Sequence, residues 1–317
     1  MQKNHRQNNP KIAIITVTYN ASNFLESFID CCDAQAPRNI NLQYYVIDND
    51  SRDETRDILQ RKTASNAWNI IYNKSNVGIA AANNQGIIKA IADKCEYIIL
   101  LNNDTSFESD FFQALYDHII KTGAQVVVPK IYYDTPPNTI WYGGGDFAPL
   151  KGMTGRHIGI NETDSIKFND DKNVDYAPTC AMLLHAKVFH AVHLMDESYF
   201  VYFDDTDFCL RLKRKKIDIN YTAATSMVHK VGGSTGGRYS EFTVRMTARN
   251  RLYYISRHFG DLAALAWAPV FILHYIFQYI TGRMSGKILS IAIKSSLSYK
   301  KIKPAIRDVA GKIVNAD

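Results

Sequence analysis

The chain has 317 residues and a formal net charge of +6, and 46% of its residues are hydrophobic. These values fit one large α/β catalytic domain with an appendage. The five cysteines are scattered and form no CxxC pair, which argues against a disulfide framework or a zinc site and fits a reducing cytosol. Residues 1–10 are polar and lack the apolar run of a secretory signal, so we expect a disordered lead-in there.

The first half of the chain alternates β-rich runs with helical segments. Strands are expected at 11–19, 42–49, 68–73, 96–102 and 124–129, and helices at 22–33, 53–63, 79–93 and 108–121. This alternation predicts βαβ units and a mostly parallel, doubly wound sheet. Polar clusters follow four of the strands, at 16–20, 48–50, 73–76 and 102–104. Ligands bind at the carboxyl ends of strands in such sheets, so we expect all four clusters at one edge.

The pattern weakens between 131 and 176, where Gly, Pro and Asp predict irregular strands and loops. Regular structure is expected again at 178–190. The loop at 229–240 contains four glycines, which suit either a flexible lid or a solvent loop without a task.

Three carboxylates, Asp204, Asp205 and Asp207, follow a run of aromatic residues at the start of a helix-like segment. Close like charges and apolar neighbours both raise carboxyl pKa values, which suits a proton acceptor or a cation site. The alternative is a helix cap with an acidic first turn. That alternative explains one Asp well and three poorly.

The C-terminal segment 262–280 has nineteen residues, about enough to cross a bilayer as a helix. Both of its flanks are basic, and Pro269 lies inside it. We therefore expect an interfacial or re-entrant element at the inner face of the cell membrane, followed by a basic amphipathic stretch at 287–303. Burial against the catalytic domain or in a homo-oligomer is the alternative. No nucleic-acid-binding motif accompanies the basic stretch.

The loop after the first strand, TVTYNASN, contains neither a dinucleotide-binding nor a P-loop glycine motif, which disfavours dinucleotide oxidoreductases and P-loop kinases. Five segments instead resemble glycosyltransferase family 2, whose GT-A fold transfers a sugar from a nucleotide diphosphate. They are TVTYN (16–20), VIDNDSRDET (46–55), NVGIAAANNQG (76–86), LLNNDT (100–105) and FVYFDDTDFCLR (200–211). The resemblance covers about residues 11 to 257 and looks closest to bacterial rhamnosyl- and galactofuranosyltransferases.

The resemblance implies a GT-A catalytic domain at 11–240, with a nucleotide half at about 11–130 and an acceptor half at about 131–240. Residues 241–317 would form the helical, basic, membrane-associated region. The implied activity is the transfer of a sugar, with inversion, from a dTDP- or UDP-sugar to a saccharide acceptor, which we expect to be lipid-linked. The product would belong to a surface polysaccharide such as O-antigen or capsule.

For the nucleoside, the resemblance implies contacts from Thr18, Tyr19, Asn20 and Asp48, with Asp50 nearby. An ionised carboxylate is a suitable acceptor for the ring N–H of uracil or thymine. An Asx-turn that caps the next helix is the alternative for both Asp residues. We favour nucleotide contact for Asp48 and leave Asp50 open.

The segment 76–86 would place further nucleotide-sugar contacts at Asn76, Gly78 and Asn84. Small residues let the backbone approach a ligand, and the free N–H groups of a first helical turn favour phosphate. Tight packing of helix on sheet explains the alanines of this segment equally well.

The metal motif of the family, usually Asp-x-Asp, aligns with Asn102, Asn103 and Asp104. A bound Mn²⁺ or Mg²⁺ would neutralise the diphosphate leaving group. Asn102 replaces the first Asp, so we expect weaker metal binding or further ligands, and His229 is the candidate extra ligand. Imidazole suits manganese better than magnesium. A lone His at a strand end is otherwise more often structural.

The resemblance makes Asp205 the base that deprotonates the acceptor hydroxyl, with Asp204 raising its basicity or holding the acceptor. Asp207 and Arg211, four residues apart, are expected to pair along the helix. The remaining candidates for acceptor contact or structural support form two groups. The aromatic residues Tyr199, Phe200 and Tyr202 either form a platform for a sugar ring or belong to the core. Trp141 and Asp146 either line the donor or acceptor pocket or shape a hairpin.

Two other functions stay open. A non-catalytic scaffold subunit is suggested by Asn102. A nucleotide-sugar pyrophosphorylase shares the sheet and the metal chemistry, but it would need a glycine- and arginine-rich loop in place of TVTYNASN.

Overall fold

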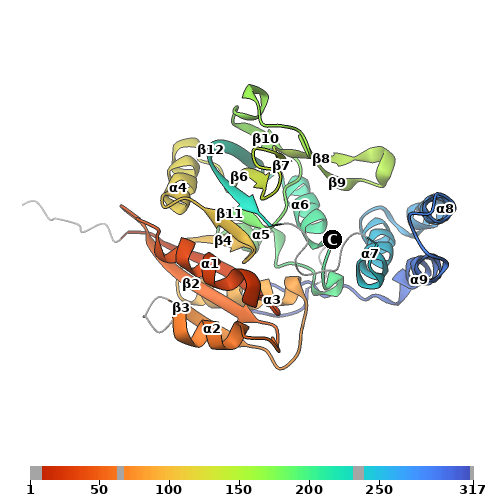
Figure 1. Ribbon diagram of the computed structural model, residues 1–317, viewed down its shortest axis with the longest axis horizontal. Coiled ribbons are helices and arrows are strands. Elements are labelled where there is room, and N and C mark those ends of the chain that lie inside the picture. The colour runs from red at the N-terminus through yellow and green to blue at the C-terminus, as the bar shows by residue number, and fades with distance from the viewer. Residues whose placement is uncertain (1–8, 63–67, 231–238, 315–317) are drawn as a thin grey trace, which may run out of the picture.

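A central sheet organises the computed structural model, which describes residues 9–62, 68–230 and 239–314 (Figure 1). Its strand order is β10-β12-β6-β11-β4-β1-β2-β3, with β5 paired to β12 and β7 to β6. The strands of the first half are β1 (Lys11–Thr18), β2 (Asn41–Asp48), β3 (Trp68–Tyr72), β4 (Tyr97–Leu101), β5 (Thr105–Phe107) and β6 (Val126–Tyr133). The remaining strands are β7 (Ile140–Tyr142), β8 (Gly145–Ala148), β9 (Thr154–His157), β10 (Lys172–Val174), β11 (Ala181–His185) and β12 (Ile219–His229).

The sheet is mostly parallel, as predicted. Strands β3, β2, β1 and β4 run parallel to one another. Strand β11 lies antiparallel between β4 and β6, and β12 runs parallel to β6. Central strands such as β1 and β4 are apolar on both faces, as expected of strands covered by helices on both sides.

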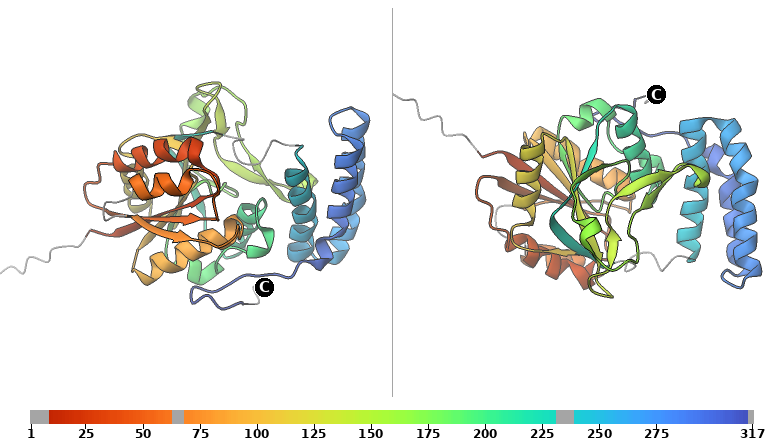
Figure 2. Two further views of the ribbon diagram at one scale, coloured as in Figure 1. Left: turned by 60° about the horizontal axis from the view of Figure 1, so that its bottom comes forward. Right: turned by 90° about the horizontal axis from the view of Figure 1, so that it is seen from above.

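Helices cover both faces of the sheet. Those of the catalytic body are α1 (Ser22–Asp33), α2 (Thr55–Lys62), α3 (Ile79–Ala92), α4 (Phe111–Thr122), α5 (Val188–Val192) and α6 (Asp204–Arg214). Figure 2 shows α1 and α2 on one face and α3 on the other, the doubly wound arrangement. Helix α1 buries Leu25, Phe28, Ile29 and Cys32, a spacing that places one apolar stripe against the sheet.

The stretch expected to be irregular does form short strands, turns and 3₁₀ helices. Strands β8 and β9 make a two-stranded hairpin of their own. The 3₁₀ helices of the chain are η1 (Pro149–Lys151), η2 (Ile166–Phe168), η3 (Glu197–Tyr199) and η4 (Tyr299–Lys301).

Three C-terminal helices form a layer beside the sheet (Figures 1 and 2). They are α7 (Glu241–Phe259), α8 (Asp261–Ile280) and α9 (Gly286–Leu297), and each of them contacts the other two. Pro269 lies inside the continuous helix α8. The chain then returns to the catalytic body, where the N–H groups of Leu194 and Glu197 donate to the carbonyls of Arg307 and Ala305. This tail therefore holds the segment that leads into α6.

Candidate active site

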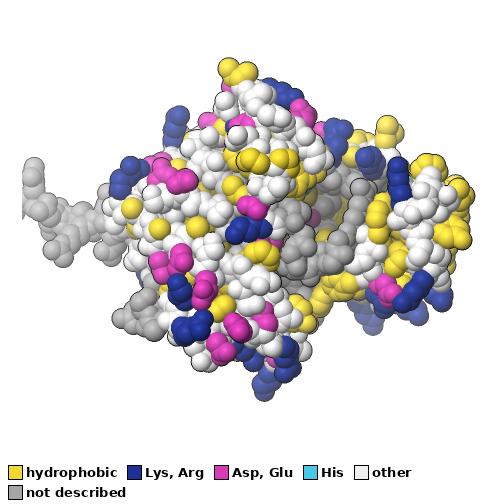
Figure 3. Space-filling model, in the orientation of Figure 1, with side chains coloured by type: hydrophobic (Ala, Val, Ile, Leu, Met, Phe, Trp, Pro, Cys, Tyr) yellow, Lys and Arg dark blue, Asp and Glu magenta, His cyan; other side chains and the backbone are white. Residues whose placement is uncertain are grey.

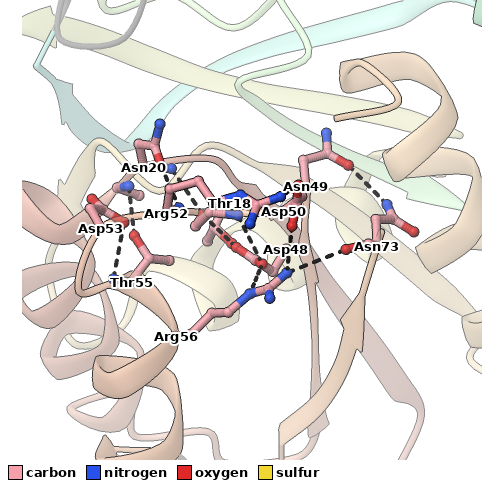
Figure 4. Close-up of polar contacts among 12 residues, drawn as sticks. Thr18, Asn20, Asp48, Asn49, Asp50, Arg52, Asp53, Thr55, Arg56 and Asn73 are labelled. Atoms are coloured by element: carbon pink, nitrogen blue, oxygen red, sulfur yellow. Dashed lines mark hydrogen bonds and ion pairs between the residues drawn. The ribbon is translucent and has the colours of Figure 1, made fainter. Parts of the chain in front are cut away.

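Three of the four polar clusters, those after β1, β2 and β3, lie together at the carboxyl edge of the parallel strands, as predicted (Figure 4). The hydroxyl of Thr18, the last residue of β1, donates to Asp48 at the end of β2 over 3.1 Å. The amide of Asn73, directly after β3, donates to Asn49 over 2.9 Å. The fourth cluster is joined to the first through Asn103, whose side-chain amide donates to the backbone carbonyl of Val17 over 2.7 Å.

The carboxylate of Asp48 is buried and has protein donors on both oxygens. Ser51 donates through its hydroxyl (2.5 Å) and its N–H (3.2 Å), and Arg56 donates through Nε (2.8 Å). Asp48 therefore accepts from a residue of its own turn but does not cap α2, because the N–H of Thr55 at the start of that helix donates to Asp53. Arg56 also lies 3.4 Å from Asp50 and over the ring of Tyr72. Arg56 could not be predicted from the sequence, because its position is typical of a helix surface and only the tertiary fold brings it next to the ends of β2 and β3.

Tyr19 and Asn20 are exposed in this corner, and Asp50 is partly exposed. Tyr19 is 45% exposed, and Asp50 has a left-handed backbone with φ 64° and pairs with Arg52 over 2.5 Å. Asn20 is also left-handed, and its side-chain oxygen accepts from the N–H of Arg52. These side chains lie at the surface beside the Asp48 cluster.

The residues of the 76–86 segment take part in contacts within the protein. Asn84 is buried, and its amide exchanges two hydrogen bonds with the backbone of Met195. Asn76 accepts from the N–H of Gly78. Gly78 has φ 87°, and a Cβ there would lie 2.6 Å from the carbonyl oxygen of Phe200. That carbonyl accepts from the N–H of Ile79, so a donor predicted for phosphate is already used by the protein.

Asp104 and His229 face each other where β5 pairs with the end of β12. Oδ1 of Asp104 lies 3.1 Å from Nε2 of His229, and both side chains are largely buried. Within the residues that the structure describes, Oδ1 of Asp104 accepts no hydrogen bond and Nδ1 of His229 has no partner. Two neighbouring ligands of one octahedral ion, each about 2.1 Å from it, lie about 3.0 Å apart. The pair therefore fits a divalent cation.

The rest of the metal motif supplies no further charge. Asn102 donates its N–H to the carbonyl of Cys180, and the side chain of Asn103 is committed to Val17. Across the described ranges, no group of three or more His, Cys, Asp or Glu side chains forms a closed metal site. A cation here would need oxygens from a substrate, as is usual for magnesium on phosphates.

Asp205 is the only one of the three acids in the first turn of α6 that is partly exposed; Asp204 and Asp207 are buried. The hydroxyl of Tyr176 donates to Oδ2 of Asp205 over 2.7 Å. Thr206 donates to Oδ1 through its N–H (2.6 Å) and its hydroxyl (3.1 Å). Both oxygens are thus held in place while the carboxylate keeps an open side, which suits a general base.

Asp204 and Asp207 differ in charge state although both are buried. Burial, together with the neighbouring Asp205, raises the pKa of Asp204 to about 8, so a proton stays on it at neutral pH. Burial also works to raise the pKa of Asp207, but Arg211 and His258 outweigh it and hold that pKa well below its usual value. The predicted pair of Asp207 and Arg211 is confirmed at 2.8 Å, and Nε2 of His258 lies 2.6 Å from Asp207. Asp207 therefore ties α6 to α7 rather than facing an acceptor.

A row of aromatic rings joins the metal pair to Asp205. The ring of Trp141 meets His229 edge-on at 4.6 Å and His157 at 4.5 Å between centroids. His157 lies 5.7 Å from Tyr176, whose hydroxyl holds Asp205. Burial lowers the pKa of His157, which keeps this ring neutral. Trp141 therefore lies between His229 and His157.

The thiol of Cys180 lies near both Asp104 and Asp205. Burial raises the pKa of Cys180, and the charges of both Asp104 and Asp205 add to that increase. One side chain therefore senses both carboxylates. Asp146, in contrast, pairs with Arg156 across the β8–β9 hairpin over 2.6 Å and shapes that hairpin.

The segment before α6 is held in an unusual backbone conformation. Phe200, Tyr202 and Phe203 all have positive φ, between 65° and 70°. The amide of Asn250 on α7 donates to three carbonyls of this segment, among them that of Tyr202. Such strained segments cluster at functional sites and persist only where the surroundings impose them. No sequence pattern pointed to Asn250, and Tyr176 was missed because it lies in the irregular stretch.

Comparisons with known proteins agree with this geometry. Residues 13–192 match the family model Glycosyl transferase family 2. The chain is 23% identical to the low-salt glycan biosynthesis hexosyltransferase Agl10 of Haloferax volcanii, over 76% of this chain and 74% of that protein. It is 22% identical to the rhamnosyltransferase WbbL of Escherichia coli K12, over 80% of this chain and 98% of that protein.

A solved structure of GalNAc-T7 with UDP, GalNAc and Mn²⁺ has a similar fold, with a TM-score of 0.58 at 13% identity. The alignment covers 78% of this chain and 51% of that one, so the chain spans about half of its length. At this identity the likeness shows the fold alone.

Proposed function

The chain belongs to glycosyltransferase family 2, and from this premise we propose that it is an inverting hexosyltransferase that uses Asp205 as its base and Asp104 with His229 as its metal ligands. Family membership makes it a glycosyltransferase with a nucleotide-sugar donor and a saccharide acceptor. The observation that carries the finer assignment is the half-open Asp205 carboxylate, held by Tyr176 and joined to the metal pair by one wall of rings.

The donor is assigned to the carboxyl edge of β1, β2 and β4. The nucleoside would lie beside the Asp48 cluster, where Tyr19, Asp50 and Arg56 border open surface. Arg56 is a cation at a carboxylate-rich edge and would contact a donor phosphate. If Arg56 turned to the phosphate, Asp48 would keep its hydrogen bonds from Thr18 and Ser51. We propose a dTDP- or UDP-sugar, which the UDP in the GalNAc-T7 structure supports for the base class.

Asp104 and His229 would hold a divalent cation, Mn²⁺ or Mg²⁺. When bound, it would neutralise charge on the departing diphosphate. The Mn²⁺ named in the GalNAc-T7 structure supports this assignment, as does the imidazole ligand. With Asn102 in place of an Asp, Asp104 is the single carboxylate of this motif, so the donor's own oxygens must complete the shell.

The reaction is a single displacement with inversion. Asp205 accepts the proton of an acceptor hydroxyl, and that oxygen forms a bond to the anomeric carbon of the donor sugar. The bond from this carbon to the diphosphate oxygen breaks, and its electron pair leaves with the diphosphate. Tyr176 and Thr206 keep the carboxylate oriented through the step, and the proton on the buried Asp204 avoids a second negative charge beside it. No covalent enzyme intermediate is required.

The acceptor class is a saccharide in surface polysaccharide synthesis, such as O-antigen or capsule. The printed names of the relatives, a hexosyltransferase for a glycan and a rhamnosyltransferase, support this class. The strained aromatic segment before Asp204 offers Phe200 and Tyr202 beside the base. A lipid-linked form of the acceptor is considered with the C-terminal helices below.

A screen of nucleotide sugars tests the proposal. The purified chain is incubated with dTDP- and UDP-sugars, with Mn²⁺ or with EDTA, and release of nucleotide diphosphate and thermal protection are measured. We expect protection by at least one nucleotide diphosphate and metal-dependent release of it. Protection without release or transfer for any donor would favour a scaffold subunit, and absence of any nucleotide protection would contradict the proposal.

A further inference from the structure

Helix α8 has one apolar face that the described part of the chain leaves open to solvent. Its exposed residues, with Ala266 and Pro269 among them, recur every three or four positions, so they form one ridge along the helix. The larger ones are Leu262, Leu265, Val270, Leu273, Phe277 and Ile280, with exposed fractions from 49% to 83%. The ridge is about 27 Å long, from the rise of 1.5 Å per residue. Exposed apolar surface of this length marks an interaction site.

The opposite face of α8 is packed against protein. Phe271 and Tyr275 are buried, and the guanidinium of Arg251 on α7 lies 4.7 Å from the ring centre of Phe271. Helix α9 lies along α8 and turns Lys287 and Lys294 outward. If α8 crossed a bilayer, these lysines would enter hydrocarbon with it, at high cost. The length and composition of α8 would allow a span, but its packing favours a helix that lies on a surface.

A second exposed apolar side chain lies near α8. The β8–β9 hairpin ends in η1, where Leu150 is 91% exposed next to the exposed Lys151. The hairpin tip is fixed to the helical layer, because the hydroxyl of Tyr254 donates to the carbonyl of Met153. A Cβ on Gly152 would lie 3.3 Å from the ring of Phe271. Leu150 is therefore anchored beside α8 rather than free to move away.

The charges around the ridge select its partner. Between 281 and 303 the chain carries six Lys or Arg and no Asp or Glu. The basic residues are Arg283, Lys287, Lys294, Lys300, Lys301 and Lys303. Figure 3 shows hydrophobic side chains on the side of the helical layer where α8 lies, and Lys and Arg side chains at the edges of the same layer. A second copy of the same face would bring like charges together, whereas anionic headgroups complement them.

We propose that the exposed ridge of α8, with Leu150 at the hairpin tip, lies in the headgroup region of an anionic lipid bilayer. Interfacial helices bury their apolar face about 5–10 Å into the headgroup and acyl boundary. The basic side chains of α9 and of the following segment bind the headgroups. The occupant is a lipid surface, and the chain lies on it without crossing it.

This surface is mechanically connected to the catalytic segment. Helix α7 lies between α8 and the residues before α6, and its Asn250 and Arg249 donate to the carbonyl of Tyr199. The site is thus held at a fixed offset from the lipid surface. On the proposed function, on which this last step rests, the acceptor is a lipid-linked saccharide presented at that surface.

Vesicle sedimentation of the full chain tests the inference. Vesicles contain phosphatidylcholine alone or with phosphatidylglycerol, and binding is measured at low and high salt. The apolar variant Leu265→Ser/Leu273→Ser removes two exposed side chains without touching the buried face. The matched control is Ile120→Ser on α4, which removes a side chain that is 54% exposed on the catalytic body. A charge variant, Lys294→Gln/Lys300→Gln, tests the basic part.

We expect the parent and Ile120→Ser to sediment with the anionic vesicles, more weakly at high salt, and the apolar variant to partition about tenfold or more weakly. The charge variant should lose its preference for anionic lipid.

Equal binding by all variants, or no binding by the parent, overturns the inference. A dimer that dissociates in the apolar variant, without lipid binding, would assign the ridge to a second copy instead. Release of nucleotide diphosphate in detergent-free solution should be unchanged in every variant, which separates this test from that of the catalytic proposal.

Discussion

The hydroxyl of Tyr176 lies 2.7 Å from Oδ2 of Asp205, although 29 positions of sequence separate the two residues. Because Tyr176 is buried with its ring against His157, it can hold the carboxylate in one orientation. Two donors from Thr206 fix the other oxygen. The active carboxylate is thus positioned by a residue from the irregular stretch before β11, not by its own helix alone.

Tyr176→Phe should lower kcat by about 10- to 100-fold, because it removes one hydrogen bond to a charged group. The KM for the donor should stay within about twofold, since Tyr176 does not contact the donor edge. The control is Tyr142→Phe, which removes a similarly buried hydroxyl that donates to the carbonyl of Tyr176. Steady-state kinetics on both variants checks this, and an equal loss in the two would contradict a positioning role.

Asp204 should make the stability of the protein fall as the pH rises. Its pKa is raised from 3.8 to about 8 by burial and by Asp205, so between these values the native state holds a proton that the unfolded state releases. Unfolding is therefore favoured with increasing pH across this window. Asp204→Asn removes the effect, and the Tm of the variant relative to the parent should increase from about pH 4 to pH 8.

Asp207→Asn is the contrasting variant in the same helical turn. The lowered pKa of Asp207 stabilises the native state above its unfolded pKa of 3.8, and that stabilisation is lost as the pH falls. At neutral pH the variant leaves Arg211 and His258 without their buried carboxylate, which costs about 3–5 kcal/mol. Thermal melts over a pH series measure both variants. If the Tm difference from the parent changed with pH in the same direction in both variants, the opposite pKa shifts assigned to Asp204 and Asp207 would be refuted.

His229→Ala should raise the Mn²⁺ concentration needed for half-maximal activity by on the order of tenfold or more, because it removes one of two protein ligands. His190→Ala, at an exposed position on α5, is the control. Asn102→Asp should lower the Mn²⁺ requirement by adding the missing carboxylate. Titration of activity and of thermal protection with Mn²⁺ gives both numbers. Identical Mn²⁺ curves for parent and His229→Ala would remove His229 from the metal site.

Gly78→Ala should destabilise the protein by about 3 kcal/mol or more. Its φ of 87° is unfavourable for Ala, and the new Cβ would meet the carbonyl oxygen of Phe200 at 2.6 Å. Gly123→Ala is the matched control, since φ there is 68° but nothing lies within 4 Å, and we expect a loss of about 1 kcal/mol. Chemical denaturation compares them. A loss at Gly78 no larger than at Gly123 would show that the contact with Phe200 is not tight.

Much of the fold was predictable from periodicity. Alternating apolar strands and amphipathic helices fixed the βαβ half, and the polar clusters at strand ends reached the same edge because parallel strands share one direction. The Asp207 and Arg211 pair was predictable because it depends only on spacing within a helix.

The remaining parts of the site depend on tertiary contacts that have no local pattern. Tyr176 and Asn250 reach the catalytic segment from irregular backbone and from α7. Asn84 was assigned to the nucleotide, but the return of the chain at Met195 occupies its amide. The exposure of Asp205 against the burial of Asp204 could not be predicted either, since both belong to one run of acids. Only the packing of α6 separates their roles.

The most direct test of the account is the Asp205→Asn variant in single-turnover transfer with saturating donor and Mn²⁺. The control is Asp218→Asn, an exposed carboxylate just before β12, at the opposite edge of the sheet. We predict a rate reduced by about 10²- to 10⁴-fold in Asp205→Asn, with thermal protection by the nucleotide diphosphate unchanged. A rate within about threefold of the parent, with protection retained, would show that Asp205 is not the base and would contradict the mechanism.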